Sequence, residues 1–183
     1  MIVLAIDPGT VQSAWLAFDT ATGVPVTSDE SDFGPARRLF GIEPNGELIE
    51  RLRGWHDAAR VGEVPFLDAV IIERVMSYGM AIGAETIETI HWAGRFAGAA
   101  YPTLVYRIPR LTIKMALCHS TRANDATVRA ALIDRFGGKA AAIGRKAASG
   151  PLYQIKADLW SSLALACCFA DMEPVDRAAA RLP

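Results

Sequence analysis

Apolar residues recur along the chain in short runs separated by polar turns, a pattern typical of a protein that mixes strands and helices. The first run, Ile2 to Ile6, has strand length and ends at the sequence Asp7-Pro8-Gly9-Thr10. A second run, Val11 to Phe18, follows at once, and the more polar segment Val24 to Phe33 suits a strand at a sheet edge. The chain is therefore predicted to open with three antiparallel strands.

The rest of the pattern alternates helices with strands. Residues 34–46 are rich in Pro and Gly and predict a loop, in which Asn45 can cap a helix over 47–60. Residues 66–75 and 103–108 predict two further strands, and the first is apolar enough to be covered on both faces. The predicted fold is α/β, with a central mixed five-stranded sheet, antiparallel then parallel, flanked by helices.

Four more helices complete the prediction. One of them is dense in small residues, and another starts at Asn124 or Asp125 as its cap. The segment 139–150 is predicted to be a loop because it holds few large apolar residues. The helices are predicted over 84–100, 111–118, 125–135 and 157–171.

Length and composition narrow the class of protein. The 183 residues can bury a sizeable core as one domain over 1–183, and 51% hydrophobic against 21% charged residues excludes a disordered chain. No segment supplies the roughly 20 apolar residues that a membrane span needs. No signal peptide precedes the first strand, so we expect a cytoplasmic protein, in a bacterial or phage-infected cell. Cys118, Cys167 and Cys168 lack metal-binding spacing and are predicted to be free thiols.

Charge is distributed unevenly, although the net charge is only −1. Residues 1–106 carry seven Lys/Arg against fourteen Asp/Glu, residues 107–156 carry ten against two, and residues 157–183 carry two against four. The basic middle segment favours a surface that faces a polyanion, while an ordinary solvated surface is the alternative.

Three acidic residues are candidates for chemistry. Asp7 ends the first strand, where Pro8 and Gly9 shape a tight turn, and Glu73 lies inside an apolar strand where an unpaired carboxylate is costly. Asp158 lies at the start of the last helix. If the first and fourth strands are neighbours, all three can meet, and clustered carboxylates call for a hard cation such as Mg²⁺ or Mn²⁺. Two such ions could activate water against a phosphodiester.

The sequence resembles the RuvC family of Holliday-junction resolvases, particularly its phage-type members. The resemblance rests on IDPGT at 6–10, IIERV at 71–75, the Lys114 segment and KADLWSSLALA at 156–166, in that order. It implies an RNase H-like fold and a Mg²⁺- or Mn²⁺-dependent endonuclease that cuts four-way or branched DNA. It also implies that Asp7, Glu73 and Asp158 bind the metal, with Lys114 as a basic residue beside the site.

Two positions depart from the family pattern. Ser161 stands where many members carry a fourth carboxylate, so it is a weaker candidate metal ligand, and Asp125 stands where many carry a second lysine. These changes leave open an alternative function, in which the chain is a catalytically weakened junction-binding or regulatory module on the same fold.

The DNA-facing surface is predicted from the loop after Glu73 and from the basic segment. Met76 and Tyr78 could stack on an unpaired base, or merely contact the local surface. The candidate DNA-binding cations are Arg110, Lys114, Arg122, Arg145, Lys146 and Lys156.

A homodimer is predicted from the two-fold symmetry of a four-way junction. Gly94 and Gly98 lie on one face of the helix over 84–100 and could form the contact, unless that face covers the protein's own sheet and the dimer uses Ile90 or Phe96 instead. Actin-like ATPases and sugar kinases share a similar D-x-G-T turn, but they need a second phosphate-binding domain, so no nucleotide cofactor is expected.

Overall fold

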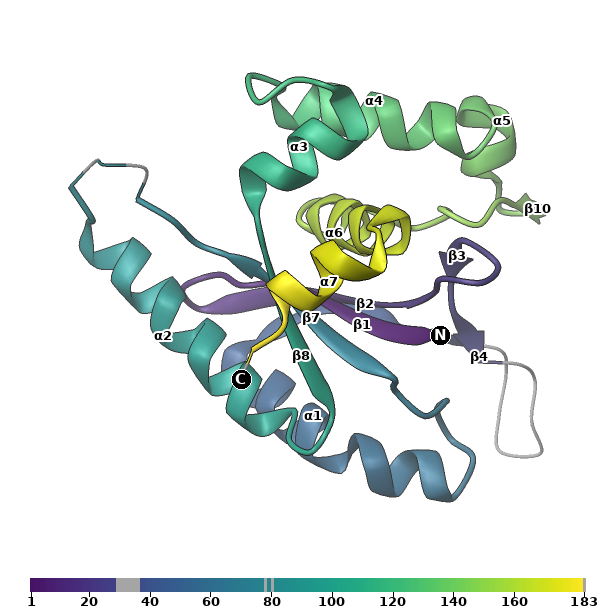
Figure 1. Cartoon of the computed structure of the whole chain (residues 1–183). Coiled ribbons are helices and arrows are strands. Elements are labelled where there is room, and N and C mark those ends of the chain that lie inside the picture. Colours follow the sequence, from purple (N-terminus) through teal and green to yellow (C-terminus); the bar gives the residue numbers. More distant parts are fainter. Residues whose placement is uncertain (29–36, 78, 80, 183) are drawn as a thin grey trace.

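The fold is built on a mixed β-sheet. A computed structural model describes residues 1–28, 37–77, 79 and 81–182. Its main sheet has six strands in the order β3-β2-β1-β7-β8, with β6 also paired to β2 (Figure 1). β1 (Ile2–Asp7) runs antiparallel to β2 (Gln12–Asp19) and parallel to β7 (Ala69–Arg74), which runs parallel to β8 (Leu104–Pro109). The predicted mixed sheet, antiparallel then parallel, is confirmed.

The edge beside β2 differs from the prediction. The third strand was predicted over 24–33, and the structure shows the short strands β3 (Val24–Pro25) and β4 (Thr27–Ser28), while 29–36 lie outside the described residues. The loop predicted over 34–46 is wrong in part, because β5 (Arg37–Arg38) pairs with β4 and β6 (Phe40–Pro44) pairs with β2. Pro44 is tolerated in a strand because it ends β6 at the sheet edge, where the missing N–H breaks no central ladder.

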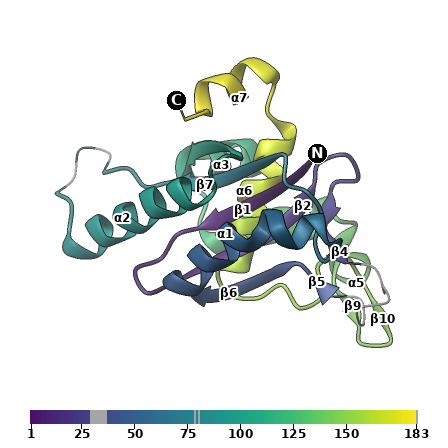
Figure 2. The same cartoon turned by 90° about the horizontal axis from the view of Figure 1, so that it is seen from below.

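Two helices cover one face of the sheet. α1 (Asn45–Arg60) and α2 (Ala84–Ala99) lie against the strands below the sheet in Figure 1 and in front of it in Figure 2. Trp55 and Phe96 are buried there among the side chains of Leu4, Ile6 and Ile72. The alternation of side chains along a strand therefore assigns these three positions to the α1–α2 face.

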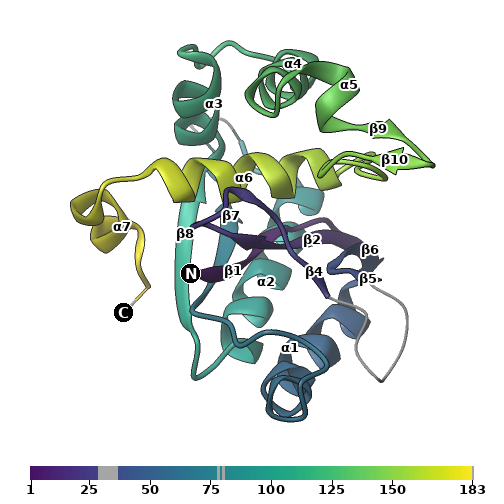
Figure 3. The same ribbon diagram turned by 90° about the vertical axis from the view of Figure 1, so that its right-hand side faces the viewer.

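The opposite face is covered by α6 (Leu159–Asp171), and a further layer lies beyond it (Figures 1 and 3). That outer layer holds α3 (Arg110–Cys118), α4 (Asp125–Arg135) and α5 (Gly138–Ala142). Leu163, Ala164 and Leu165 of α6 are fully buried. Because α6 is enclosed between the sheet and the outer layer, it is apolar almost all round.

The outer layer corrects one prediction and refines another. The segment 139–150 was predicted to be a loop, but it contains most of α5 and a hairpin of β9 (Gly144–Arg145) and β10 (Ala148–Ser149). Of the two candidate caps of α4, Asn124 is the one used, since its side-chain oxygen accepts from the Thr127 N–H at 2.9 Å. The three cysteines are free, as predicted.

The end of the described chain folds back onto β8. The short helix α7 (Pro174–Ala180) follows α6 and was not predicted. After it, the Leu182 N–H donates to the Val105 carbonyl oxygen at 2.9 Å, and the backbone of Arg181 forms an isolated antiparallel β-bridge with Tyr106. Within the described ranges, none of the helices combines the length and apolar character needed to cross a membrane.

Candidate active site

The turn after β1 is fixed by a small buried network. The Gly9 N–H donates to Ser13 Oγ at 3.1 Å, the Ser13 hydroxyl donates to Asn45 Oδ1 at 2.6 Å, and Asn45 Nδ2 donates to the Gly9 carbonyl at 3.0 Å. A Cβ on Gly9 would overlap the Gln12 carbonyl oxygen, so only glycine fits there. Asn45 was predicted to cap α1, and this is wrong, because its side chain holds the turn that follows Asp7.

Asp7 and Glu73 are neighbours on the face covered by α6. In the parallel pairing of β1 with β7, Ile6 lies opposite Ile72, so the next residue on each strand is Asp7 and Glu73. Side chains alternate between the two faces, and Ala5 and Ile71 belong to the core cluster under α6. Two residues further along each strand, Asp7 and Glu73 therefore project from the same face at the carboxyl ends of their strands.

The start of α6 brings in the third carboxylate. Asp158 occupies the N-cap position of α6 and is exposed, while Ser161 lies one turn later and is partly buried. Leu159 and Trp160 between them are buried and hold this end of the helix against the fold. The Arg129 guanidinium of α4 lies over the Trp160 ring, 4.8 Å from its centroid, which ties the outer layer to the same end of α6.

The pKa of Asp7 is raised by burial and by nearby carboxylates. Its pKa is raised from 3.8 to about 7, first by burial and then by the charge of Glu73. Asp158 raises it further, whereas Arg110 and a hydrogen bond from the Ser161 side chain lower it. Segments that lie far apart in the sequence thus act electrostatically on one carboxylate.

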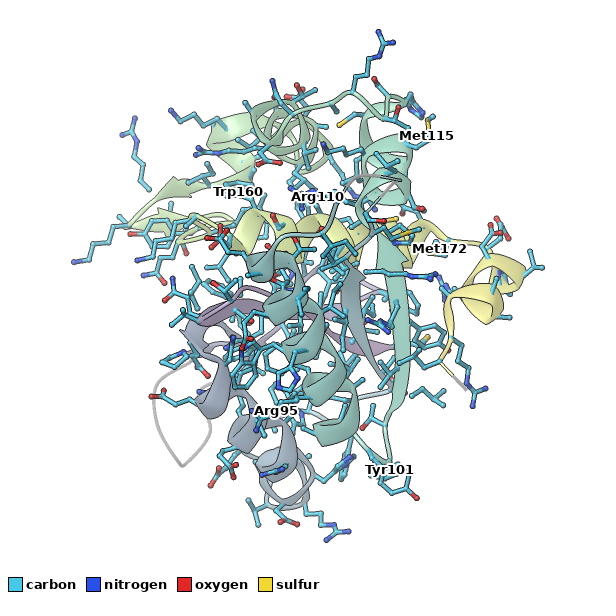
Figure 4. All side chains as sticks on the ribbon, turned by 90° about the vertical axis from the view of Figure 1, so that its left-hand side faces the viewer. Arg95, Tyr101, Arg110, Met115, Trp160 and Met172 are labelled. Atoms are coloured by element: carbon cyan, nitrogen blue, oxygen red, sulfur yellow. The ribbon has the colours of Figure 1, made fainter. Side chains whose placement is uncertain are left out.

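Glu73 is held by a cation from α3. Burial raises the pKa of Glu73, and the Arg110 guanidinium, which donates to Glu73 Oε2 at 2.9 Å, lowers it. The charge of Lys114, one turn further along α3, also lowers the pKa of Glu73. The second arm of Arg110 donates to Asp125 Oδ1 at 2.6 Å. Figure 4, viewed from the side toward which β1 ends, labels Arg110 beside α6.

The donor set fits a hard divalent cation. Asp7, Glu73, Asp158 and Ser161 offer oxygen atoms only, which Mg²⁺ prefers, and the mutual repulsion that raises the pKa of Asp7 is what a cation would relieve. Among the described residues, however, no three His, Cys, Asp or Glu side chains converge as ligands of one ion. Arg110 engages one of the two carboxylate oxygens of Glu73.

The remaining predicted site residues divide between the site and the surface. Met76 is 40% exposed in the loop after β7, and Tyr78 lies outside the described residues. Arg110 is not a free surface cation, since it bridges Glu73 and Asp125. The other predicted basic residues belong to the outer layer and its connection to α6, and all but Lys114 are exposed: Lys114, Arg122, Arg145, Lys146 and Lys156.

A separate hollow of ≈ 770 Å³ lies between β8, α3, α6 and α7. Met115 and Met172, both labelled in Figure 4, line its walls. None of Asp7, Glu73 and Asp158 belongs to the lining, so the hollow is distinct from the candidate site.

Sequence reasoning missed two parts of the site. The first is the anchoring of the Asp7 turn by Ser13 and Asn45, both 1% exposed. An Asn at the start of a predicted helix carries no signal in the sequence that distinguishes an anchor of a neighbouring turn from a cap. The second is the pairing of Arg110 with Glu73 and Asp125, for which the available signal was that Asp125 is one of two acidic residues in the basic segment 107–156.

Comparison with known proteins supports the fold assignment. No protein-family model and no curated protein matches the chain. Among solved structures, RuvC of Thermus thermophilus matches with a TM-score of 0.57 and 21% identity, covering 100% of this chain and 99% of that one. The T. thermophilus RuvC in complex with a Holliday junction substrate matches with a TM-score of 0.59 and 20% identity, with the same coverage. The chain therefore has the RNase H-like fold of RuvC.

Proposed function

We propose that this protein is a crossover junction endodeoxyribonuclease that depends on Mg²⁺ or Mn²⁺. The observation that carries the proposal is that Asp7 and Glu73 end neighbouring strands on one face, where burial and the charges of Glu73 and Asp158 raise the pKa of Asp7 to about 7. A protein that merely used this fold as a scaffold would gain nothing from burying mutually repelling carboxylates. The match to a RuvC structure that contains a Holliday junction supports four-way DNA as the substrate.

Each side chain has a role in this proposal. Asp7, Glu73 and Asp158 hold the metal, and the Ser161 hydroxyl, which hydrogen-bonds Asp7, orients that carboxylate. Bound metal ions would supply an activated water and would neutralise charge on the leaving oxygen. The charge of Lys114 acts on Glu73, and its ammonium group would bind a phosphate next to the cleaved bond.

The DNA arms would lie along the outer layer. Arg122, Arg145, Lys146 and Lys156 are exposed, and they come from the basic segment that forms this layer and leads into α6. A phosphate backbone that contacts them would pass close to Asp158 at the start of α6. Met76, 40% exposed next to Glu73, is a candidate for stacking at the junction centre.

The proposed enzyme acts as a homodimer through α2. Gly94 and Gly98 face open space, whereas Phe96 is fully buried and Ile90 is partly buried, which favours the glycine face over the face of Ile90 and Phe96. Ile87, two turns before Gly94 on the same helix face, is 59% exposed and adds an apolar side chain to this surface. The first turns of α2 also extend past the sheet edge (Figure 2). Two sites related by a dyad would match the symmetry of the junction.

A second candidate function is junction binding without efficient cutting. Two features favour it: Ser161 is a hydroxyl where the family that the sequence resembles often has a carboxylate, and Arg110 engages one oxygen of Glu73. A hydroxyl is a weaker ligand than a carboxylate, so a relative with this site could bind branched DNA and regulate its processing.

A cutting assay separates the two functions. The purified chain is incubated with a synthetic four-way junction and Mg²⁺, and binding is measured in parallel in EDTA. We expect two opposed strands to be nicked by the wild type, and Asp7→Asn, Glu73→Gln and Asp158→Asn to lose cutting while binding the junction. Asp134→Asn, an exposed position on α4, is the matched control and should cut normally. Wild-type protein that binds junctions but leaves them intact with Mg²⁺ and Mn²⁺ would establish the second function instead.

A further inference from the structure

Arg110 is placed between a candidate metal ligand and an exposed carboxylate. Its two terminal nitrogens reach Glu73 Oε2 at 2.9 Å and Asp125 Oδ1 at 2.6 Å. The side chain of Glu73 is 13% exposed and that of Asp125 is 84% exposed, so one partner faces the site and the other faces solvent. The guanidinium therefore connects the inside of the site to its rim.

The backbone of Asp125 is held by a capped helix. It is the first residue of α4, and the preceding Asn124 caps this helix through the Thr127 N–H at 2.9 Å. Arg110 is the first residue of α3, directly after β8, where Pro109 closes the strand. Both ends of the Arg110–Asp125 contact thus start from capped or strand-anchored backbone, and the contact can persist if the Glu73 contact breaks.

Arg110 and a divalent cation would compete for Glu73. A guanidinium and a metal ion that share one carboxylate repel each other at close range, and this repulsion is large where solvent is partly excluded. Outward movement of the guanidinium relieves this repulsion and frees the Glu73 oxygen that Arg110 engages. Asp125 is the acceptor that lies in that direction.

We propose that Arg110 is the resident counter-ion of Glu73, that it yields this carboxylate when a divalent cation binds, and that Asp125 is the positioning residue that retains it. The proposal rests on the metal-binding role proposed above for Glu73. It assigns a role to Asp125, one of two acidic residues in the basic segment 107–156.

The test measures binding of Mg²⁺ alone to the full chain by calorimetry, without DNA. The titrations are done at pH 8.5, above the pKa of about 7 for Asp7, so that this carboxylate is ionised. Arg110→Gln should bind Mg²⁺ about tenfold more tightly, because the competing charge is gone. Asp125→Asn should bind it about threefold more weakly, because Arg110 then has Glu73 as its remaining partner. The double variant should behave like Arg110→Gln.

Two further measurements keep the result interpretable. Arg53→Gln, which removes an exposed arginine paired with Glu50 on α1, is the matched control and should leave Mg²⁺ affinity unchanged. Thermal unfolding in EDTA checks that each variant is folded. If Arg110→Gln binds Mg²⁺ no better than wild type, or if Asp125→Asn binds it as well as wild type, the proposal is wrong. If no variant binds Mg²⁺, the proposal is wrong as well.

The outcome is separable from that of the proposed function. If the Mg²⁺ affinities of the two variants shift in opposite directions but junctions stay uncut, the release of Glu73 by Arg110 is supported and the nuclease function is refuted. If junctions are cut but both variants bind Mg²⁺ like wild type, the nuclease function is supported and Arg110 only forms an ion pair with Glu73.

Discussion

Replacing Asp7 with Asn should stabilise the metal-free protein, although it removes a residue of the candidate site. Burial and the charge of Glu73 raise the pKa of Asp7 from 3.8 to about 7. In the unfolded chain the carboxyl group titrates near its ordinary value, so the folded state binds more protons between pH 4 and pH 7. Stability therefore falls as pH rises through this window, and the loss is complete above pH 7.

The size of the effect follows from the shift. A change from 3.8 to about 7 is about three pKa units, which corresponds to at most about 4 kcal/mol of unfolding free energy. Asn keeps the shape of the side chain and removes the charge, but its amide also loses part of the attraction of Arg110. We therefore expect Asp7→Asn to gain about 2 to 4 kcal/mol at pH 8 in EDTA, or at least about 4 °C in Tm.

Urea unfolding at pH 4.0, 5.5 and 8.0, in EDTA, measures this directly. Wild type should lose stability across the series relative to Asp7→Asn, and the two should nearly agree at pH 4.0. Asp134→Asn on the exposed face of α4 should follow wild type. Added Mg²⁺ should stabilise wild type and leave Asp7→Asn almost unaffected. An Asp7→Asn variant with the pH dependence of wild type would refute the claim that this carboxylate is electrostatically strained.

Three further predictions concern the surfaces and the turn. The log of the affinity for junction DNA should fall linearly with the log of the salt concentration, and removing the charges of Arg145 and Lys146 together should reduce this slope by about 0.9 per lost phosphate contact. Removing the charges of Arg53 and Arg60 on α1 should leave the slope unchanged. Gly98→Leu should weaken self-association, measured by sedimentation, and should leave the fold intact because no atoms crowd this position. Gly54→Leu on α1, where the surroundings are equally open, is the matched control and should leave self-association unchanged. A wild type that stays monomeric at high micromolar concentration, with and without junction DNA, contradicts the dimer. Asn45→Ala should cost about 2 to 4 kcal/mol in urea unfolding, because it leaves the Ser13 hydroxyl and the Gly9 carbonyl without their partner, and a cost below about 1 kcal/mol would show that water replaces the amide.

The carboxylates could be predicted to meet because their positions depend on strong, local signals. Apolar runs fix β1 and β7 and their faces, and the abrupt change to Asp7 and Glu73 marks where the chain leaves the core. The long apolar helix that carries Asp158 is equally clear in the sequence. Strand and helix periodicity together with chain order therefore indicated which residues would share a corner.

The missed features depend on contacts between elements. Arg110 pairs with Glu73 and Asp125 only because α3 and α4 pack at one angle over α6, and no periodicity encodes that angle. Gly94 and Gly98 suggested close packing, yet the structure shows open space around both. β6 was missed because Gly41 and Pro44 have low strand propensity, which its pairing with β2 overrides.

The enclosure of α6 limits how this site can change. Of its residues from Leu159 to Asp171, all but Ser161, Ala170 and Asp171 are buried, so nearly every position contacts the sheet or the outer layer. A substitution in the body of the helix would disturb two layers at once. The start of α6 is the exception, because Asp158 and Ser161 are not fully buried. Evolution could therefore exchange a carboxylate for a hydroxyl at 161, and retune the chemistry, without repacking the helix that supports it.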